Sequence, residues 1–74
     1  RLISEQTLRE VRSLIRLLPD SQREVVIMRF YQDMSFKEIA DVTGVSINTA
    51  LGRMRYALMN LKKLALANDI SMAS

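Results

Sequence analysis

The chain has 74 residues, of which 49% are hydrophobic and only four are aromatic, and it contains neither cysteine nor histidine. This composition favours an all-α protein and excludes disulfides, the usual zinc, iron–sulfur and haem sites, and catalysis by a Cys–His or Ser–His pair. Since the sequence also lacks a cofactor motif and paired carboxylates at catalytic spacing, we expect a protein that is not an enzyme and holds no metal or cofactor.

The first part of the chain predicts a helix over about residues 4–18. Leu8, Val11, Ile15 and Leu18 recur at steps of three and four residues, which is typical of the apolar stripe of an amphipathic helix. Pro19 ends this helix, because proline disfavours a helical residue before it and has no backbone N–H to continue the hydrogen bonds.

A second helix is predicted to begin near residue 20 or 21, where Ser21 and Glu24 have the spacing of a capping box, and to run to about residue 32. Its segment "VVIMRFY" leaves almost no polar face. A helix that is apolar nearly all round is usually a buried one. We therefore expect it to form the centre of the core, with six side chains inside: Val25, Val26, Ile27, Met28, Phe30 and Tyr31.

A third helix is predicted over about residues 36–43. Ser35 precedes it and Glu38 follows three residues later, which is again the spacing of a capping box. Gly44 can adopt the left-handed backbone conformation that ends helices at low steric cost. We expect the inward face of this helix to consist of Ile39, Ala40 and Val42.

A fourth helix is predicted to begin behind Ser46, a favoured N-cap residue, and to extend to about residue 67. At 1.5 Å per residue its length is about 30 Å. That is long for so small a core, so we expect one end to project or to pack along the first helix. Its apolar seam is expected to comprise Ile47, Ala50, Leu51, Met54, Ala57, Leu58, Leu61, Leu64 and Ala65.

The two closely spaced helices, about residues 35–58, have the sequence shape of a helix-turn-helix. In that motif the second helix directs its amino-terminal residues into the major groove of DNA. Residues 46–74 hold four Lys and Arg against one Asp, so the basic excess of the chain lies in this part. Four residues suit contacts to phosphate: Lys37, Ser46, Thr49 and Arg53. Five occupy base-facing positions: Asn48, Leu51, Gly52, Arg55 and Tyr56.

Residues 17–64 resemble the carboxy-terminal promoter-reading domain, region 4, of bacterial sigma factors, and are most similar to the extracytoplasmic-function branch. The features that carry the resemblance are, in order, Leu18-Pro19, Arg23-Glu24-Val25, Glu38-Ile39-Ala40, Gly44-Val45-Ser46, Thr49, Arg53, Ala57 and Leu58. The sequence departs from the family pattern in that Ala50 stands where valine or isoleucine is usual and Tyr56 where arginine is common. Leu51 and Gly52 also replace residues that are often polar.

The resemblance implies a four-helix domain of the winged-helix-like superfamily without the wing. It implies binding to the −35 promoter element within RNA polymerase holoenzyme, docking on the flap of the polymerase β subunit, and in many members masking by an anti-sigma factor. Thr49 and Arg53 match the family positions that contact the DNA backbone.

Two other functions stay open at this point. The output domain of a response-regulator-type activator shares the "EIA…G.S..T" pattern, but usually has Leu-Thr where this chain has Leu18-Pro19. A helical protein-interaction module would use the heptad-like seam of the fourth helix. A test of DNA binding would separate the protein-interaction module from the other two, because a response-regulator output domain and a sigma factor domain both bind DNA.

We expect residues 1–74 to form a single domain. Because the chain begins with Arg1 and not Met, we expect a fragment of a longer protein in which a region 2 domain precedes it. No run of 18 apolar residues is present, so we expect no membrane span and a cytoplasmic location.

Overall fold

The structure, a computed structural model, describes residues 4–68. It is all-α, as predicted, with no strand in that range. Its elements are α1 (Glu5–Ile15), α2 (Asp20–Val26), the π-helical segment η1 (Ile27–Tyr31) that continues α2, α3 (Phe36–Thr43) and α4 (Ile47–Ala67). The predicted bounds of the third and fourth helices agree with α3 and α4, whereas the first helix ends three residues earlier than expected.

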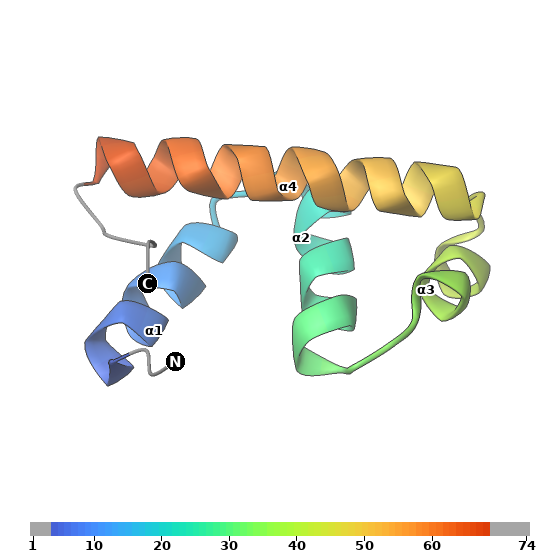
Figure 1. Ribbon diagram of the computed structural model, residues 1–74, viewed down its shortest axis with the longest axis horizontal. Coiled ribbons are helices and arrows are strands. Elements are labelled where there is room, and N and C mark those ends of the chain that lie inside the picture. The colour runs from blue at the N-terminus through green and yellow to red at the C-terminus, as the bar shows by residue number, and fades with distance from the viewer. Residues whose placement is uncertain (1–3, 69–74) are drawn as a thin grey trace.

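The long helix α4 forms one side of the molecule, and the other helices pack against it in succession (Figure 1). α1 contacts its carboxy-terminal half, α2 its middle and α3 its amino-terminal end. The molecule measures 35 × 22 × 17 Å, so α4 spans nearly its whole length. The expectation that the end of this helix packs along the first helix is therefore confirmed.

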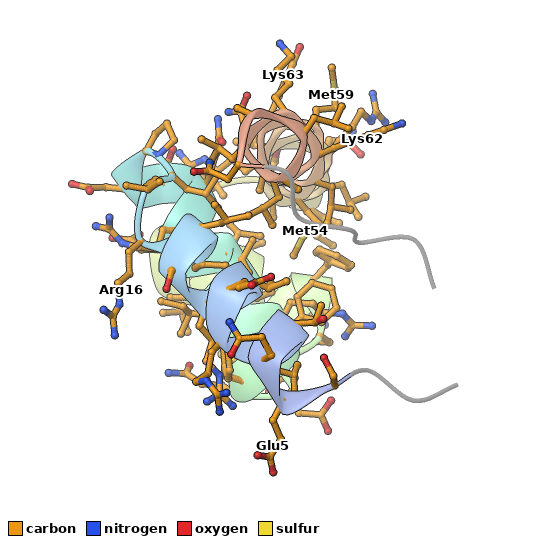
Figure 2. All side chains as sticks on the ribbon, turned by 90° about the vertical axis from the view of Figure 1, so that its left-hand side faces the viewer. Glu5, Arg16, Met54, Met59, Lys62 and Lys63 are labelled. Atoms are coloured by element: carbon orange, nitrogen blue, oxygen red, sulfur yellow. The ribbon has the colours of Figure 1, made fainter. Side chains whose placement is uncertain are left out.

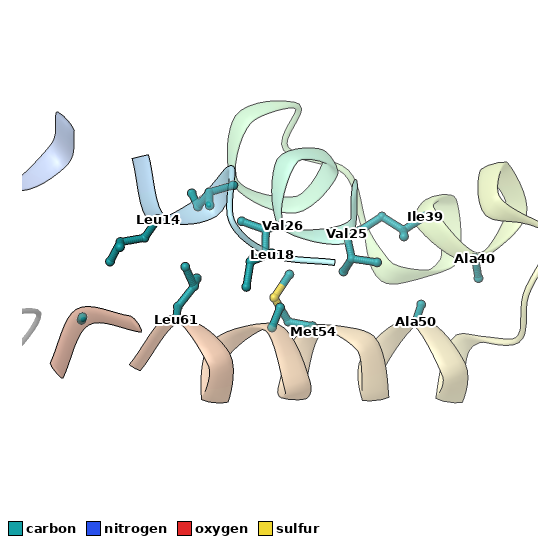
Figure 3. Close-up of a cluster of buried hydrophobic side chains, with 12 residues drawn as sticks. Leu14, Leu18, Val25, Val26, Ile39, Ala40, Ala50, Met54 and Leu61 are labelled. Carbon is teal, nitrogen blue, oxygen red and sulfur yellow. The ribbon is translucent and has the colours of Figure 1, made fainter. Parts of the chain in front are cut away.

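The hydrophobic core lies between α4 and the three helices packed on it (Figure 3). Val25, Val26 and Ile39 are the largest side chains that are fully enclosed. Figure 3 shows Ala50 and Met54 pointing from α4 toward them. The other buried residues are Leu14, Ile15, Leu18, Ala40, Ala57, Leu61 and Ala65. Small alanines on α4 let the shorter helices approach it closely, which explains how so short a chain closes a core.

The predicted burial of the second helix is wrong at its carboxy-terminal end. Phe30 is 64% exposed and Tyr31 is 52% exposed, while Ile27 and Met28 are only partly buried. The helix changes there from α to π winding, and the Gln32 N–H bonds the Ile27 carbonyl five residues back. Met28 still packs against the core, whereas Phe30 and Tyr31 are exposed, so burial ends within the π-helical segment.

Arginines lie over the aromatic rings at this end. The guanidinium of Arg12 is 5.9 Å from the ring centre of Tyr31, and that of Arg29 is 5.1 Å from the ring centre of Phe36. Arg29 also donates a hydrogen bond to the Met34 carbonyl at 2.9 Å. These contacts connect η1 with α1 and with the beginning of α3.

Four smaller predictions are also corrected. Ser21 does not cap the second helix, because Pro19 is its N-cap and the Pro19 carbonyl accepts hydrogen bonds from Gln22 N and Arg23 N at 3.0 and 2.9 Å. In the first helix Leu8 is exposed. Val42 is 65% exposed, since α3 is covered by α4 on one side only. The seam of α4 is narrower than predicted, and the exposed members are Ile47, Leu51 and Leu58.

Candidate nucleic-acid interface

The first helix of the helix-turn-helix, α3, begins with the predicted capping box. The Glu38 N–H donates to Ser35 Oγ at 3.1 Å, and the Ser35 N–H donates in return to Glu38 Oε1 at 2.9 Å. The hydrogen bond from the Ser35 backbone, and then that from its side chain, lower the pKa of the Glu38 carboxyl below its usual value. The start of α3 is thus determined by two residues that lie three positions apart in the sequence.

The turn between α3 and α4 depends on Gly44. Its φ of 72° and ψ of 30° lie in the left-handed region, where a Cβ is unfavourable. This conformation ends α3 and lets the Val45 N–H bond the Ala40 carbonyl at 3.0 Å. Ser46 then begins α4, accepting from the Thr49 N–H at 3.1 Å and contacting Thr49 Oγ1 at 3.0 Å. The sequence "TGVS" therefore ends one helix and begins the next, which runs across it (Figure 1).

The outward face of α4 follows from its buried face. Successive residues of an α-helix are about 100° apart, so Ala50, Met54 and Ala57, which are buried, define the side facing the core. Asn48 and Tyr56 lie on the opposite side and are exposed, with Gly52 between them at four-residue spacing. The structure therefore brings these three predicted base-facing residues into one outward line.

The other predicted residues of α4 lie on the two flanks of this line. Thr49 and Arg53, predicted to contact phosphate, share one flank, and Arg53 is partly covered there. Leu51 and Arg55, predicted to face bases, are exposed on the other flank. Thr49 and Arg53 thus lie on the same side of the line. Residues that contact one strand of the DNA backbone beside the helix would have this arrangement.

Two predicted phosphate residues lie outside the body of α4. Ser46 is exposed at its amino terminus, where four backbone N–H groups lack helical partners and favour an anion. Lys37 is exposed in the first turn of α3, on the other helix of the motif, so the structure does not bring it into the line on α4.

The charge of α4 has one sign. The helix contains Arg53, Arg55, Lys62 and Lys63 and no acidic residue. The ion pairs found within residues 4–68 join Arg9 to Glu5 and Arg23 to Asp20, so none of them involves a cation of α4. Since no carboxylate compensates these four charges within the helix, its exposed surface attracts a polyanion.

Sequence reasoning missed the continuation of the outward line. Met59 and Lys63 are exposed and extend beyond the predicted end of the motif at residue 58. Figure 2, which looks along α4, shows Met59, Lys62 and Lys63 projecting from its outer side, with Met54 on the inner side. Steps of three and then four residues lead from Tyr56 to Met59 and Lys63, so extending the helical period by two turns would have found these residues.

The described residues form neither a metal site nor a membrane-spanning helix. Within residues 4–68 no cluster of three or more His, Cys, Asp or Glu side chains is arranged to hold a metal ion. In the same range, none of the helices combines the length and apolar character needed to cross a bilayer. A shallow groove lined by Leu17, Leu18, Pro19, Asn60, Lys63 and Leu64 is apolar on most of its surface and brings no catalytic groups together.

A capped helix, a tight left-handed turn and a second helix with a cationic outer face define a helix-turn-helix domain. Residues 8–61 match the family model described as "Sigma-70, region 4". The chain belongs to this family, which confirms the resemblance seen in the sequence and replaces the alternative of a response-regulator output domain.

Two curated relatives agree with the family match. The chain is 33% identical over 54 residues to RNA polymerase sigma factor SigV of Bacillus subtilis, covering 73% of this chain and 32% of the relative. It is 32% identical over 57 residues to RNA polymerase sigma-E factor of Streptomyces coelicolor, covering 77% of this chain and 32% of the relative. The chain thus matches about a third of the length of each, and both support the extracytoplasmic-function branch.

Proposed function

We propose that this chain reads the −35 promoter element as part of RNA polymerase holoenzyme and so directs transcription initiation. The observation that carries the proposal is the outer face of α4, where Asn48, Gly52 and Tyr56 form a line beside the positively charged flank of Arg53. Asparagine pairs with adenine and arginine with guanine in the major groove, whereas threonine and arginine beside the line suit phosphates.

The domain itself performs no chemistry in this proposal. Thr49, Arg53, Ser46 and Lys37 hold the phosphate backbone and determine the position of α4 on the duplex. Asn48, Leu51, Gly52, Arg55 and Tyr56 then distinguish bases. The flap of the polymerase β subunit holds the domain on the enzyme, and an anti-sigma factor can mask it. A region 2 domain would precede the chain in the intact, cytoplasmic protein.

Contacts with polymerase are supported by a second exposed surface. Phe30 and Tyr31 lie on η1, at the end of the second helix farthest from α4 (Figure 1). Two large exposed aromatic side chains on one turn are unusual for a surface without a partner, because aromatic residues are enriched in protein interfaces. The DNA-reading face and this surface point in different directions, so both partners can bind at once.

The proposal is tested by fluorescence-anisotropy titration of the 74-residue chain against duplexes of −35 length with randomised sequence, followed by recovery of the bound sequences. With about four cations near the DNA, the logarithm of affinity should fall with the logarithm of salt concentration with a slope of about −3 to −4. Enrichment of one short motif is the expected result. Absence of binding at low salt would contradict the proposal and favour a protein-interaction module.

Variants separate the two groups of residues. Arg53→Ala should weaken binding to all duplexes by a similar factor, whereas Asn48→Ala and Arg55→Ala should reduce discrimination between the enriched motif and other sequences. Arg9→Ala, which removes the same charge from α1, serves as the matched control and should bind like the unchanged chain. If all three variants of α4 weakened every duplex equally, the division into phosphate and base contacts would be wrong.

A further inference from the structure

Gly52 lies in the interior of α4, where a glycine has no evident structural purpose. It is the sixth of the 21 residues of the helix, and glycine destabilises a helix interior relative to alanine. Its φ is not positive, since among the glycines only Gly44 has that conformation. The helix therefore does not require glycine at this position for its backbone geometry.

Packing gives no reason for glycine either. Apart from the adjacent residues and the backbone of its own helix, no atom of residues 4–68 lies within 4 Å of the position that a Cβ on Gly52 would occupy. Nothing in the domain therefore approaches closely enough to exclude a methyl group. The reason for a glycine here must lie in something that contacts α4 from outside.

The position of Gly52 indicates what that contact is. It lies in the outward line one turn after Asn48 and one turn before Tyr56, so the missing side chain leaves a notch between two larger side chains. The N–H and C=O groups of a helix interior already bond one another. The floor of the notch is therefore the Cα methylene group, an apolar surface with nothing to donate or accept.

We propose that Gly52 is the point of closest approach of α4 to promoter DNA and that its notch receives the C5-methyl group of a thymine. This inference rests on the function proposed above. In the major groove the bases present hydrogen-bond donors, hydrogen-bond acceptors and a single apolar group, the thymine methyl. A donor or acceptor buried in the notch would lose its water without finding a partner, whereas a methyl group gains from burial.

The inference makes Gly52 a specificity-determining residue that recognises one thymine by shape. Leu51 is exposed on the adjacent flank and extends the apolar surface beside the notch. A side chain at position 52 would fill the notch and hold the helix away from the bases. The neighbouring contacts of Asn48 and Tyr56 would then lengthen together.

The test compares the unchanged chain with Gly52→Ala and with Ser13→Ala. Ser13 is exposed on α1, and its replacement by alanine also favours a helix, so it is a control for stabilisation away from DNA. In the duplex that binds best, each thymine is replaced in turn by deoxyuridine, which pairs identically but lacks the methyl group. Comparing the variants on the same duplexes cancels any effect of uracil on DNA shape.

We expect the unchanged chain to bind about fourfold more weakly at one thymine position when its methyl is removed, from the burial of a single methyl group. Gly52→Ala should bind the original duplex roughly tenfold more weakly, because the added methyl overfills the contact. It should also lose the difference between thymine and deoxyuridine at that position. Its thermal midpoint should nevertheless rise by about 4–8 °C, which excludes misfolding as the cause. Ser13→Ala should keep the affinity and the thymine preference.

Three results would overturn the inference while leaving the proposed function intact. They are equal binding of thymine and deoxyuridine duplexes at every position, full affinity of Gly52→Ala for the best duplex, and a best duplex without thymine in the contacted element. If the unchanged chain bound no duplex at all, the proposed function itself would fall, and the inference with it.

Discussion

The two glycines of the chain should respond in opposite ways to the same substitution. Gly44 has a φ of 72°, and an alanine in that left-handed conformation costs roughly 1–2 kcal/mol. Alanine also reduces the conformational entropy of the unfolded chain relative to glycine, which offsets about 0.4–1 kcal/mol of this cost. Since no atom lies within 4 Å of the added Cβ, packing contributes nothing further. Gly44→Ala should therefore lower the free energy of unfolding by about 1 kcal/mol.

At Gly52 the same methyl group is added to a helix interior and also meets no atom within 4 Å. Alanine is favoured over glycine there by about 0.8–1.0 kcal/mol, so Gly52→Ala should raise the free energy of unfolding by that amount. The two variants should differ by about 2 kcal/mol, which corresponds to roughly 8–16 °C in thermal midpoint for a domain of this size.

Circular dichroism at 222 nm during urea and thermal unfolding measures these differences. Because the two positions share no contact, the double variant should return to about the stability of the unchanged chain. Shifts of both single variants in the same direction would refute the reasoning, since they would show that the stability effect of a glycine here does not follow from its backbone conformation.

Three further predictions concern the core, the α3 cap and the contact between α2 and α4. Ile39→Ala should destabilise the domain by about 2–5 kcal/mol because the Ile39 side chain is fully buried. Val42→Ala on the same helix should change the free energy of unfolding by less than about 0.5 kcal/mol, because Val42 is exposed. Urea unfolding compares the two variants, and equal effects would contradict the observed exposure of Val42. Hydrogen bonds from Ser35 lower the pKa of Glu38 in the folded domain. The stability that these bonds supply is fully present above the pKa that Glu38 has in the unfolded chain. It is lost as the pH falls through the lower pKa that Glu38 has in the folded domain. The unchanged chain and Glu38→Gln should therefore differ less in free energy of unfolding at about pH 3 than at about pH 7, as measured by urea titrations. A difference that stayed constant with pH would show that the ionised Glu38 carboxylate does not supply this stability. Asn60 Nδ2 donates a hydrogen bond to Gln22 Oε1 at 2.7 Å. A double-mutant cycle with alanine at both positions should give a coupling energy of about 0.5–1.5 kcal/mol. Additive effects of the two substitutions would show that this hydrogen bond adds no stability.

The bounds of α3 and α4 could be predicted because their signals are local. A capping box, a glycine that tolerates the left-handed region and a serine N-cap each act within four residues of the chain. Ser35, Gly44 and Ser46 therefore have the same roles in the structure as in the sequence. Local hydrogen bonds decide these positions, and no distant residue has to be known.

Burial could not be predicted in the same way, because it depends on what lies opposite. Phe30, Tyr31 and Val42 are as apolar as their buried neighbours and differ only in pointing away from α4. The π winding of η1, on which the first two lie, has no distinct sequence signal. The capping-box spacing at Ser21 failed because α2 already begins at Asp20, with Pro19 as its N-cap.

The sequence predicts which side of α4 faces outward, but the predicted line of outward residues ends too early along the helix. A period of 3.6 residues places Asn48, Gly52 and Tyr56 together once the core side of α4 is known. The same period extends the line to Met59 and Lys63, which were overlooked because the family motif ends earlier. Lys37 belongs to a different helix, so spacing along α4 says nothing about its position.

The continuity of α4 gives the domain a mechanical property. One uninterrupted helix of 21 residues carries the candidate interface at one end and the contacts with α1 at the other. Such a helix is about 31 Å long and contains no hinge, so it transmits rotation as a stiff lever. A tilt of about 5° applied near Leu61 by a protein bound at the α1 end would move Ser46 by roughly 2 Å, given that length scale. That displacement is comparable with the margin between a formed and a broken hydrogen bond, so a protein bound at the α1 end would shift the candidate interface without touching it.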